Sequence, residues 1–221
     1  MTDSANTRPL SEAQITEAGN PAKPQGECGA LMLERMNRSH EEVTNWALDL
    51  LSFSPDQRVL DVGCGGGATM GRISQRMGKG SGTVVGVDYS EVSCAQSREL
   101  NAAGIASGRM EVRQASVEAL PFADASFDVV TTVESFYFWP DPVANLAEVA
   151  RVLKPGGRFL LVADVYQKDG LAQEVLDNIR RRSLTVLTPS QHEDLLLEAG
   201  FSLARAHLKE GTDWIAVEGL R

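Results

Sequence analysis

The feature that most restricts the fold is an alternation, from Arg58 onward, between short apolar segments and helical segments. Such alternation is typical of a parallel sheet with helices packed on both faces, because strands buried on both sides are apolar throughout. The sequence therefore predicts an α/β three-layer sandwich. We expect strands at residues 58–62, 83–87, 109–113, 127–133 and 157–164, with helices at about 67–77, 91–103 and 142–153.

The C-terminal end adds two more strands. Segments 201–208 and 213–219 are joined by a turn so short that it can only make an antiparallel hairpin. We therefore expect a seven-stranded, mostly parallel sheet whose last strand is antiparallel. Thr188 and Gln191 form a capping box, which predicts a helix at about 189–199.

The N-terminal end has a different composition. Residues 1–27 hold several prolines and glycines and almost no large apolar side chains, so we expect a flexible tail that cofactor binding does not need. Ser39 and Glu42 have capping-box spacing, which predicts an amphipathic helix that stops near Pro55.

Charge and cysteine content exclude several classes of protein. Lys and Arg number 21 and Asp and Glu 30, for a net charge of −9, which disfavours binding to nucleic acid or to an anionic membrane. No apolar run approaches the ~20 residues of a membrane span, so we expect no membrane insertion. The cysteines (Cys28, Cys64 and Cys94) are scattered, as in a reduced cytoplasmic protein, and predict neither a disulfide framework nor a metal site.

The segment LDVGCGGGAT, residues 60–69, follows the first predicted strand. Its glycines allow a tight turn and a close approach of the backbone to a ligand at a helix N-terminus. The spacing also fits the dinucleotide fingerprint, so an NAD-dependent oxidoreductase is one alternative. Asp61 argues against it, since a carboxylate ~4 Å from a phosphate costs about 1–4 kcal/mol. A cationic ligand without phosphate, such as S-adenosylmethionine, suits Asp61 better.

Asp88 ends the second predicted strand, next to the first, where its carboxylate can accept hydrogen bonds from both hydroxyls of a ribose. The alternative is that Asp88 caps the next helix, but Ser90 serves that role equally well.

Four motifs, LDVGCGGG, GVDYS, ASVEALPFADASFDVV and RVLKPGG, resemble those of class I S-adenosylmethionine-dependent methyltransferases, in the small-molecule branch with the ubiquinone/menaquinone-type enzymes. The resemblance runs from about Arg58 to Ala163 and implies a Rossmann-like sheet. It implies that Asp61, Gly63 and Gly65, with Cys64 and Gly67 in the same turn, surround the methionine half of the cofactor. The other cofactor-binding residues that it implies are Asp88 at the ribose, Tyr89, Ser116 and Val117 at the adenine, and Glu134 beside the sulfonium.

Ser116 stands where the family usually has an acidic residue for the adenine amino group, and Glu118, two places on, is expected to face solvent. In the family, elements before the first strand close over the cofactor. We therefore expect an N-terminal helical lid at 28–57, with its covering part at Leu31–His40 and Arg38 at the cofactor carboxylate. Residues 58–221 then form the cofactor-binding methyltransferase domain.

The sequence indicates the acceptor site less clearly than the cofactor site. Four aromatic residues at 136–139 follow the fourth predicted strand, and Tyr137 and Trp139, with Tyr166 after the fifth, are candidates for the acceptor pocket. A general base is needed only if the acceptor keeps its proton, and His40, Glu134 and Tyr137 are the candidates for a catalytic role.

The sequence thus predicts an enzyme that transfers a methyl group from S-adenosylmethionine to a small molecule by in-line displacement. A non-catalytic module that binds the cofactor and regulates a partner is the other alternative. The acceptor and the oligomeric state are left open.

Overall fold

A computed structural model describes residues 9–221 of the chain. Its centre is a seven-stranded sheet in the order β3-β2-β1-β4-β5-β7-β6. Only β7 runs against the others, since it pairs antiparallel with both β5 and β6. The predicted fold class is therefore confirmed. The strands are β1 (Arg58–Val62), β2 (Thr83–Asp88), β3 (Met110–Gln114), β4 (Phe127–Val133), β5 (Leu153–Ala163), β6 (Leu203–Leu208) and β7 (Ile215–Leu220).

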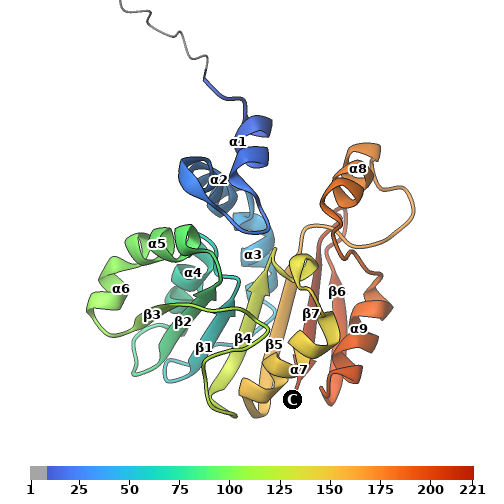
Figure 1. Ribbon diagram of the computed structural model, residues 1–221. Helices are drawn as coiled ribbons and strands as arrows, with labels where there is room; N and C mark the ends of the chain where they lie inside the picture. Colours follow the sequence, from blue (N-terminus) through green and yellow to red (C-terminus); the bar gives the residue numbers. More distant parts are fainter. Residues whose placement is uncertain (1–8) are drawn as a thin grey trace, which may run out of the picture.

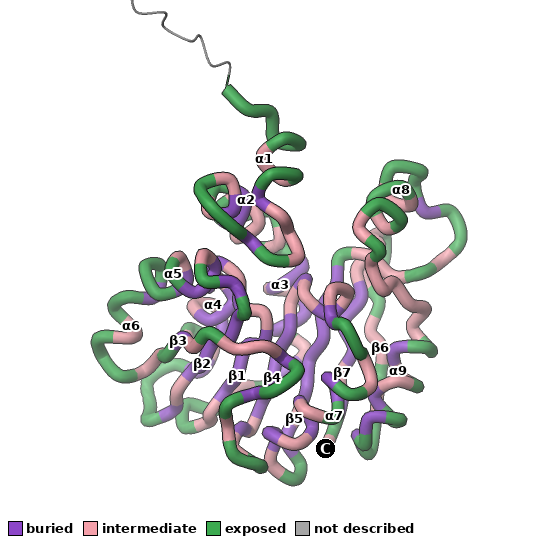
Figure 2. Tube along the Cα trace, viewed as in Figure 1, coloured by how far each residue is buried: buried purple, intermediate pink, exposed green. Residues whose placement is uncertain are grey.

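Helices cover both faces of the sheet (Figure 1). The elements on one face are α3 (Glu41–Leu48), α4 (Ala68–Met77), α5 (Glu91–Leu100) and the short α6 (Ala102–Ala106), and those on the other are α7 (Pro142–Val152) and α9 (Pro189–Glu198). Successive side chains of a strand point to opposite faces of the sheet and therefore pack in different hydrophobic cores. Val59 packs towards α3 and α4, whereas Leu60 packs towards α7. Figure 2 shows the central strands β1, β4, β5 and β7 as the most continuously buried part of the molecule, whereas the edge strands β3 and β6 are more exposed.

Helices α1 (Glu12–Gly19), α2 (Gly26–Ser39) and α8 (Gln173–Arg182) lie beyond the carboxyl ends of the parallel strands (Figure 1). Among these, α1 and α2 come from the N-terminal region, and α1 packs on α2. A capping box between Ser11 and Gln14 starts α1, so helical structure begins before residue 28, the boundary expected from the sequence. The part of the expected tail at residues 1–8 lies outside the described residues.

Three predicted boundaries need correction. The capping box at Ser39 is wrong, because α2 continues to Ser39 and the Ser39 hydroxyl donates to the Met36 carbonyl; α3 instead starts after His40 and ends at Leu48. The predicted helix at 91–103 is divided at Asn101 into α5 and α6. Strand β5 starts at Leu153, before the Pro-Gly-Gly sequence that was expected to separate α7 from it. By contrast, the box at Thr188 and Gln191 is confirmed at the start of α9.

Candidate active site

The glycine turn joins β1 to α4. The N–H groups of Gly63 and Cys64 both donate to the Val87 carbonyl, at 2.8 and 2.9 Å, which holds the turn against the end of β2. Gly63 has φ +73°, and a Cβ there would lie 2.0 Å from Ser135 Oγ. Only glycine fits this backbone and this space, so the turn brings the main chain directly against the segment after β4.

Asp88 ends β2 and is held by the same turn. Its Oδ2 accepts a hydrogen bond from the Gly65 N–H at 3.0 Å, and its Oδ1 accepts one from the Ser90 N–H at 2.8 Å. Burial raises the pKa of Asp88, and these backbone hydrogen bonds partly oppose that rise. A carboxylate has about four acceptor positions, so two remain for the hydroxyls of a ligand. The N-cap of α5 is Ser90 and not Asp88, which is evidence against the alternative that Asp88 caps this helix.

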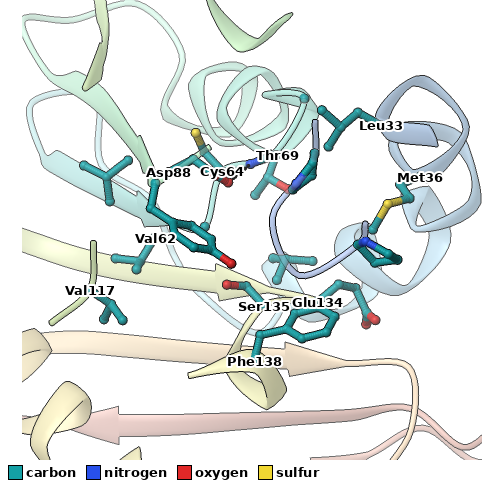
Figure 3. Close-up of a pocket in the computed structure, with 18 of the residues that line it drawn as sticks. Leu33, Met36, Val62, Cys64, Thr69, Asp88, Val117, Glu134, Ser135 and Phe138 are labelled. Carbon is teal, nitrogen blue, oxygen red and sulfur yellow. Dashed lines mark hydrogen bonds between the residues drawn. The ribbon is translucent and has the colours of Figure 1, made fainter. Parts of the chain in front are cut away.

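A cavity of about 340 Å³ opens between these elements. Figure 3 shows Cys64 and Asp88 on one side, Glu134 and Phe138 on another, and Leu33 and Met36 projecting from α2. The residues implied for cofactor binding that line it are Gly63, Cys64, Gly65, Asp88, Tyr89, Ser116, Val117 and Glu134. The structure thus brings into one cavity residues that the sequence spreads over some seventy positions.

Asp61 and Gly67 support the turn from outside the cavity wall. Asp61 is 1% exposed, and its Oδ1 accepts a hydrogen bond from the Thr131 hydroxyl at 2.8 Å. Burial raises the pKa of Asp61 to about 7. Gly67, at φ +83°, packs against Ser97 and Asn101. Neither is among the described residues that line the cavity.

The cover of the cavity begins earlier in the chain than the sequence suggested. Leu33, Met36 and His40 line the cavity, within the expected lid Leu31–His40. The segment from Pro21 to Pro24, expected to be part of a flexible tail, lines it too. The Tyr89 hydroxyl donates to the Ala22 carbonyl, and the Ser90 hydroxyl donates to the Pro24 carbonyl, so the end of β2 holds this segment in place.

Two arginines, Arg38 and Arg72, lie in places that the sequence did not predict. Arg38, expected at the cofactor carboxylate, is mostly exposed and pairs with Glu34. Arg72 of α4 lines the cavity instead, and its guanidinium donates to the Asn37 carbonyl at 3.0 Å. Glu118 is exposed, as expected, and it also lines the cavity, where it accepts a hydrogen bond from the Ser116 hydroxyl at 2.9 Å. Arg72 lies about one helical turn after the glycine turn, and this spacing could have predicted its place at the cavity.

A second cavity, of about 440 Å³, adjoins the first and shares Met36, His40 and Glu134 with it. Its other walls come from Tyr137, from the segment after β5 and from α8. The expected aromatic wall is therefore divided: Phe138 and Trp139 line the first cavity and Tyr137 the second. The two candidates Tyr137 and Trp139 thus face different cavities, because Phe136–Phe138 form a turn of 3₁₀-helix. Of the described residues, Tyr166 lines neither cavity and packs on the core.

The wall shared by the two cavities is rich in ionisable groups. The Tyr137 hydroxyl donates to Glu134 Oε2 at 2.9 Å. Burial and the nearby carboxylate of Asp164 raise the pKa of Glu134 well above its ordinary value, and burial likewise raises the pKa of Tyr137. Burial lowers the pKa of His40, so its imidazole is neutral at pH 7. The three candidates for a catalytic role therefore lie together.

A seven-stranded sheet with an antiparallel β7, and a ligand cavity at the carboxyl ends of β1, β2 and β4, define a Rossmann-like methyltransferase architecture. Comparisons with known proteins agree. A family model described as a methyltransferase domain matches residues 60–161. An O-methyltransferase of Pyrenophora dematioidea is 31% identical over 171 residues, which are 76% of this chain and 62% of that protein.

Two further relatives extend the likeness. The ubiquinone biosynthesis O-methyltransferase of Hahella chejuensis is 42% identical over 111 residues, which cover 49% of this chain and 44% of that protein. A SAM-dependent methyltransferase from Aquifex aeolicus has the same fold, with a TM-score of 0.66 at 18% identity, over 96% of this chain and 99% of that one. The chain belongs to the class I S-adenosylmethionine-dependent methyltransferases. It spans less than two thirds of the length of the first curated relatives that it matches.

No helix in the described part of the chain is both long enough and apolar enough to cross a membrane.

Proposed function

We propose that the protein transfers a methyl group from S-adenosylmethionine to a small molecule that occupies the second cavity. The observation that carries this proposal is the shared wall: Met36, His40 and Glu134 line both cavities, so a donor in the first can face an acceptor in the second. Bound S-adenosylmethionine supplies an electrophilic methyl group on a sulfonium. A cytoplasmic location, as the scattered free cysteines suggest, is part of the same proposal.

The first cavity suits the cofactor chemically. Asp88 keeps two acceptor positions for the ribose hydroxyls, and Tyr89, Ser116 and Val117 offer a face and an edge for the adenine. Arg72 offers a cation for the carboxylate of the methionine half. The glycine turn leaves its backbone free of side chains along that half.

The protein's own contribution to the reaction is alignment in a site shielded from water. Leu33 and Met36 from α2, with Pro21 and Pro24, cover the first cavity, and Tyr137 fixes the carboxyl group of Glu134 at the shared wall. Holding two reactants in line supplies ~7–11 kcal/mol of the barrier in favourable cases. A residue that removes a proton is needed only for acceptors that are protonated at pH 7.

Two measurements test the proposal. Calorimetric titration should show micromolar binding of S-adenosylmethionine and of S-adenosylhomocysteine, and a screen of small molecules should find acceptors that yield S-adenosylhomocysteine. Ile179→Trp, which fills the second cavity from α8, should abolish turnover and leave cofactor affinity within about twofold. Leu197→Trp, at an exposed position on α9, is the matched control and should leave both unchanged.

Absence of cofactor binding at high micromolar concentration would refute the proposal. Cofactor binding with no turnover on any acceptor would favour the non-catalytic module instead, and full turnover in Ile179→Trp would place the acceptor elsewhere.

A further inference from the structure

Three polar side chains from distant parts of the sequence meet at the wall between the two cavities. Glu134 follows β4, Asp164 follows β5, and His40 lies between α2 and α3. One donor or acceptor atom of each lies within 4.8 Å of those of the other two. The fold therefore concentrates two carboxyl groups and an imidazole at the place where the methyl donor and its acceptor would meet.

Glu134 is held there in a way that costs stability. Its φ of +53° is in the left-handed region, which residues with a side chain rarely adopt because the Cβ crowds the backbone. Its N–H donates to the Val162 carbonyl at 2.9 Å, which fixes that backbone between β4 and β5. Strained backbone of this kind is concentrated at functional sites.

The carboxyl group of Glu134 also has an unused acceptor atom. Oε2 receives the Tyr137 hydroxyl, whereas Oε1 is buried and has no hydrogen-bond partner within residues 9–221. Glu134 as a whole is 6% exposed. A buried oxygen without a partner is unfavourable, so its natural complement is a donor that enters with a ligand.

Asp164 and His40 can accept hydrogen bonds, and Glu134 can do so with both oxygens once a cation beside it favours the ionised form that burial and the charge of Asp164 otherwise disfavour. Asp164 is exposed and lines the second cavity with a carboxylate. His40 is a neutral imidazole, because burial lowers its pKa, and one of its ring nitrogens therefore keeps a lone pair. Three acceptors around one point match a ligand that carries several hydrogens on one positively charged atom.

The rest of the second cavity is also rich in acidic residues. Glu174 and Asp213 add carboxylates to that of Asp164, and Arg181 is the basic residue among the described lining residues. Asp213 forms an ion pair with Lys168, outside the cavity wall. Val165, Val175 and Ile179 supply apolar surface. The cavity thus favours a ligand with a cationic end and an apolar body.

We propose that the methyl acceptor is a primary or secondary amine, whose ammonium form is bound between Glu134, Asp164 and His40. This inference rests on the proposed function. An ammonium with acceptors at about 2.8 Å in tetrahedral directions needs them about 4.6 Å apart. A divalent metal ion with bonds of about 2.1 Å would need its donors about 3–3.5 Å apart, which the same limit of 4.8 Å also allows, so the test includes metal ions as the competing occupants.

The proposed reaction transfers the methyl group to the nitrogen of the bound amine. The bound ammonium gives one proton to the Asp164 carboxylate or to the His40 imidazole, which frees the nitrogen lone pair. That pair forms the new N–CH3 bond as the C–S bond breaks, and the electrons of the broken bond stay on sulfur. The products are a methylated ammonium and S-adenosylhomocysteine, and the proton leaves to solvent through the second cavity.

The test compares amines with alcohols of the same shape. The wild-type protein, with and without S-adenosylhomocysteine, is titrated calorimetrically with 2-phenylethylamine, hexylamine and benzylamine and with 2-phenylethanol, hexanol and benzyl alcohol. We expect at least one amine to bind 10-fold or more tightly than its alcohol. Asp164→Asn should weaken amine binding about 10-fold and leave alcohol binding and cofactor affinity within twofold. Asp169→Asn, an exposed carboxylate after the same strand and outside both cavities, should change neither.

The outcomes separate this inference from the proposed function. Equal or tighter binding of the alcohols, binding of no amine, or an unchanged amine affinity in Asp164→Asn would overturn the amine assignment, even if the cofactor binds and another acceptor is methylated. Micromolar binding of Mn²⁺ or Zn²⁺ that Asp164→Asn abolishes would overturn it in favour of a metal site. Failure of S-adenosylmethionine to bind would refute the proposed function instead, while amine binding to the cofactor-free protein would still support the cluster as an ammonium site.

Discussion

The part of the first cavity that follows β1, β2 and β3 comes from one stretch of chain, residues 62–118, whereas the second cavity draws its wall from segments between Met36 and Asp213. The two regions also satisfy their buried carboxyl groups differently. Asp61 and Asp88 accept hydrogen bonds from neighbouring elements, but Glu134 keeps one oxygen without a partner among the described residues. The protein thus positions both carboxyl groups of the first region with its own donors, and Asp88 still has acceptor positions for a ligand, whereas Oε1 of Glu134 has no donor within residues 9–221.

This difference suggests why members of one family can share a cofactor and differ in acceptor. The glycine turn and Asp88 are coupled through the backbone of β1 and β2, so a change there disturbs the sheet itself. The walls of the second cavity lie on α8 and on the segment after β5, outside the sheet, where substitutions are tolerated more easily. Substitutions in and around the two cavities should therefore differ in what they change, either the stability of the sheet or the binding of ligands.

The glycine turn should be the part of the molecule that is least tolerant of substitution. Gly63→Val should lower the free energy of unfolding by about 5 kcal/mol, because a Cβ would meet Ser135 and because a β-branched residue is strained at φ +73°. Urea denaturation followed by circular dichroism measures the loss. Gly211→Val is the matched control: its φ of +75° is similar, but the added Cβ has open space around it. If both variants lose equal stability, packing against Ser135 contributes nothing.

Asp61 should give the clearest pH dependence of stability. Its folded pKa of about 7 lies above the ~3.9 of an unfolded aspartic acid, so the folded state favours the protonated form. The contribution of Asp61 is fully present below pH ~4 and is lost as the pH rises to about 7. Asp61→Asn should therefore be more stable than the wild type by about 4 kcal/mol at pH 8, with a smaller difference at pH 5.

The comparison for this variant is Asp56→Asn. Hydrogen bonds from Ser81 lower the pKa of the exposed Asp56, so its ionised form stabilises the fold, and that stabilisation is lost as the pH falls through the lowered pKa. Asp56→Asn should thus lose a little stability at pH 8, with a sign opposite to that of Asp61→Asn. Urea unfolding of both variants at pH 5, 6, 7 and 8 decides the matter, and a difference for Asp61→Asn that does not grow with pH would contradict the assignment.

Asp88 should affect cofactor affinity more than stability. Asp88→Asn keeps the shape but removes the charged acceptor for two ribose hydroxyls, so we expect binding to weaken by about 2 kcal/mol, or roughly 30-fold. Its stability should also fall, but only by about 1 kcal/mol, because the side-chain NH2 group would face the N–H of Gly65 or of Ser90 where an acceptor oxygen now lies. Calorimetry with S-adenosylhomocysteine measures the change, with Asp56→Asn as a control for charge. A change below twofold would show that Asp88 does not hold the ribose.

The first region could be predicted from the sequence because its determinants are local. The run of apolar residues at 58–62 gives β1 with the bounds expected, and the glycines that follow it can only form a turn of this kind. The second region could not, because Asp164 and Ile179 carry no pattern of their own. They become lining residues only when β5 and α8 are placed beside β4, and a single sequence does not show that placement.

The N-terminal lid could be predicted from the sequence only in part. The apolar face of α2 was visible as Leu33 and Met36, and the structure places both in the wall of the cavity. The segment before it was expected to be a tail because it is polar and rich in proline. Its order depends on two side-chain hydrogen bonds from the end of β2, which composition cannot reveal.

The smallest predicted effect concerns this segment. Tyr89→Phe removes the hydroxyl that donates to the Ala22 carbonyl but keeps the ring. We expect cofactor affinity to fall about two- to threefold, since a single hydrogen bond at a half-exposed position contributes ~0.5–1 kcal/mol. Amide hydrogen exchange should become faster in residues 20–25 and stay unchanged in β2. Tyr166→Phe, a hydroxyl outside both cavities, should change neither quantity. If affinity falls while exchange in residues 20–25 is unaltered, the Tyr89 hydroxyl acts on the cofactor directly, and the segment before α2 is not part of the cover.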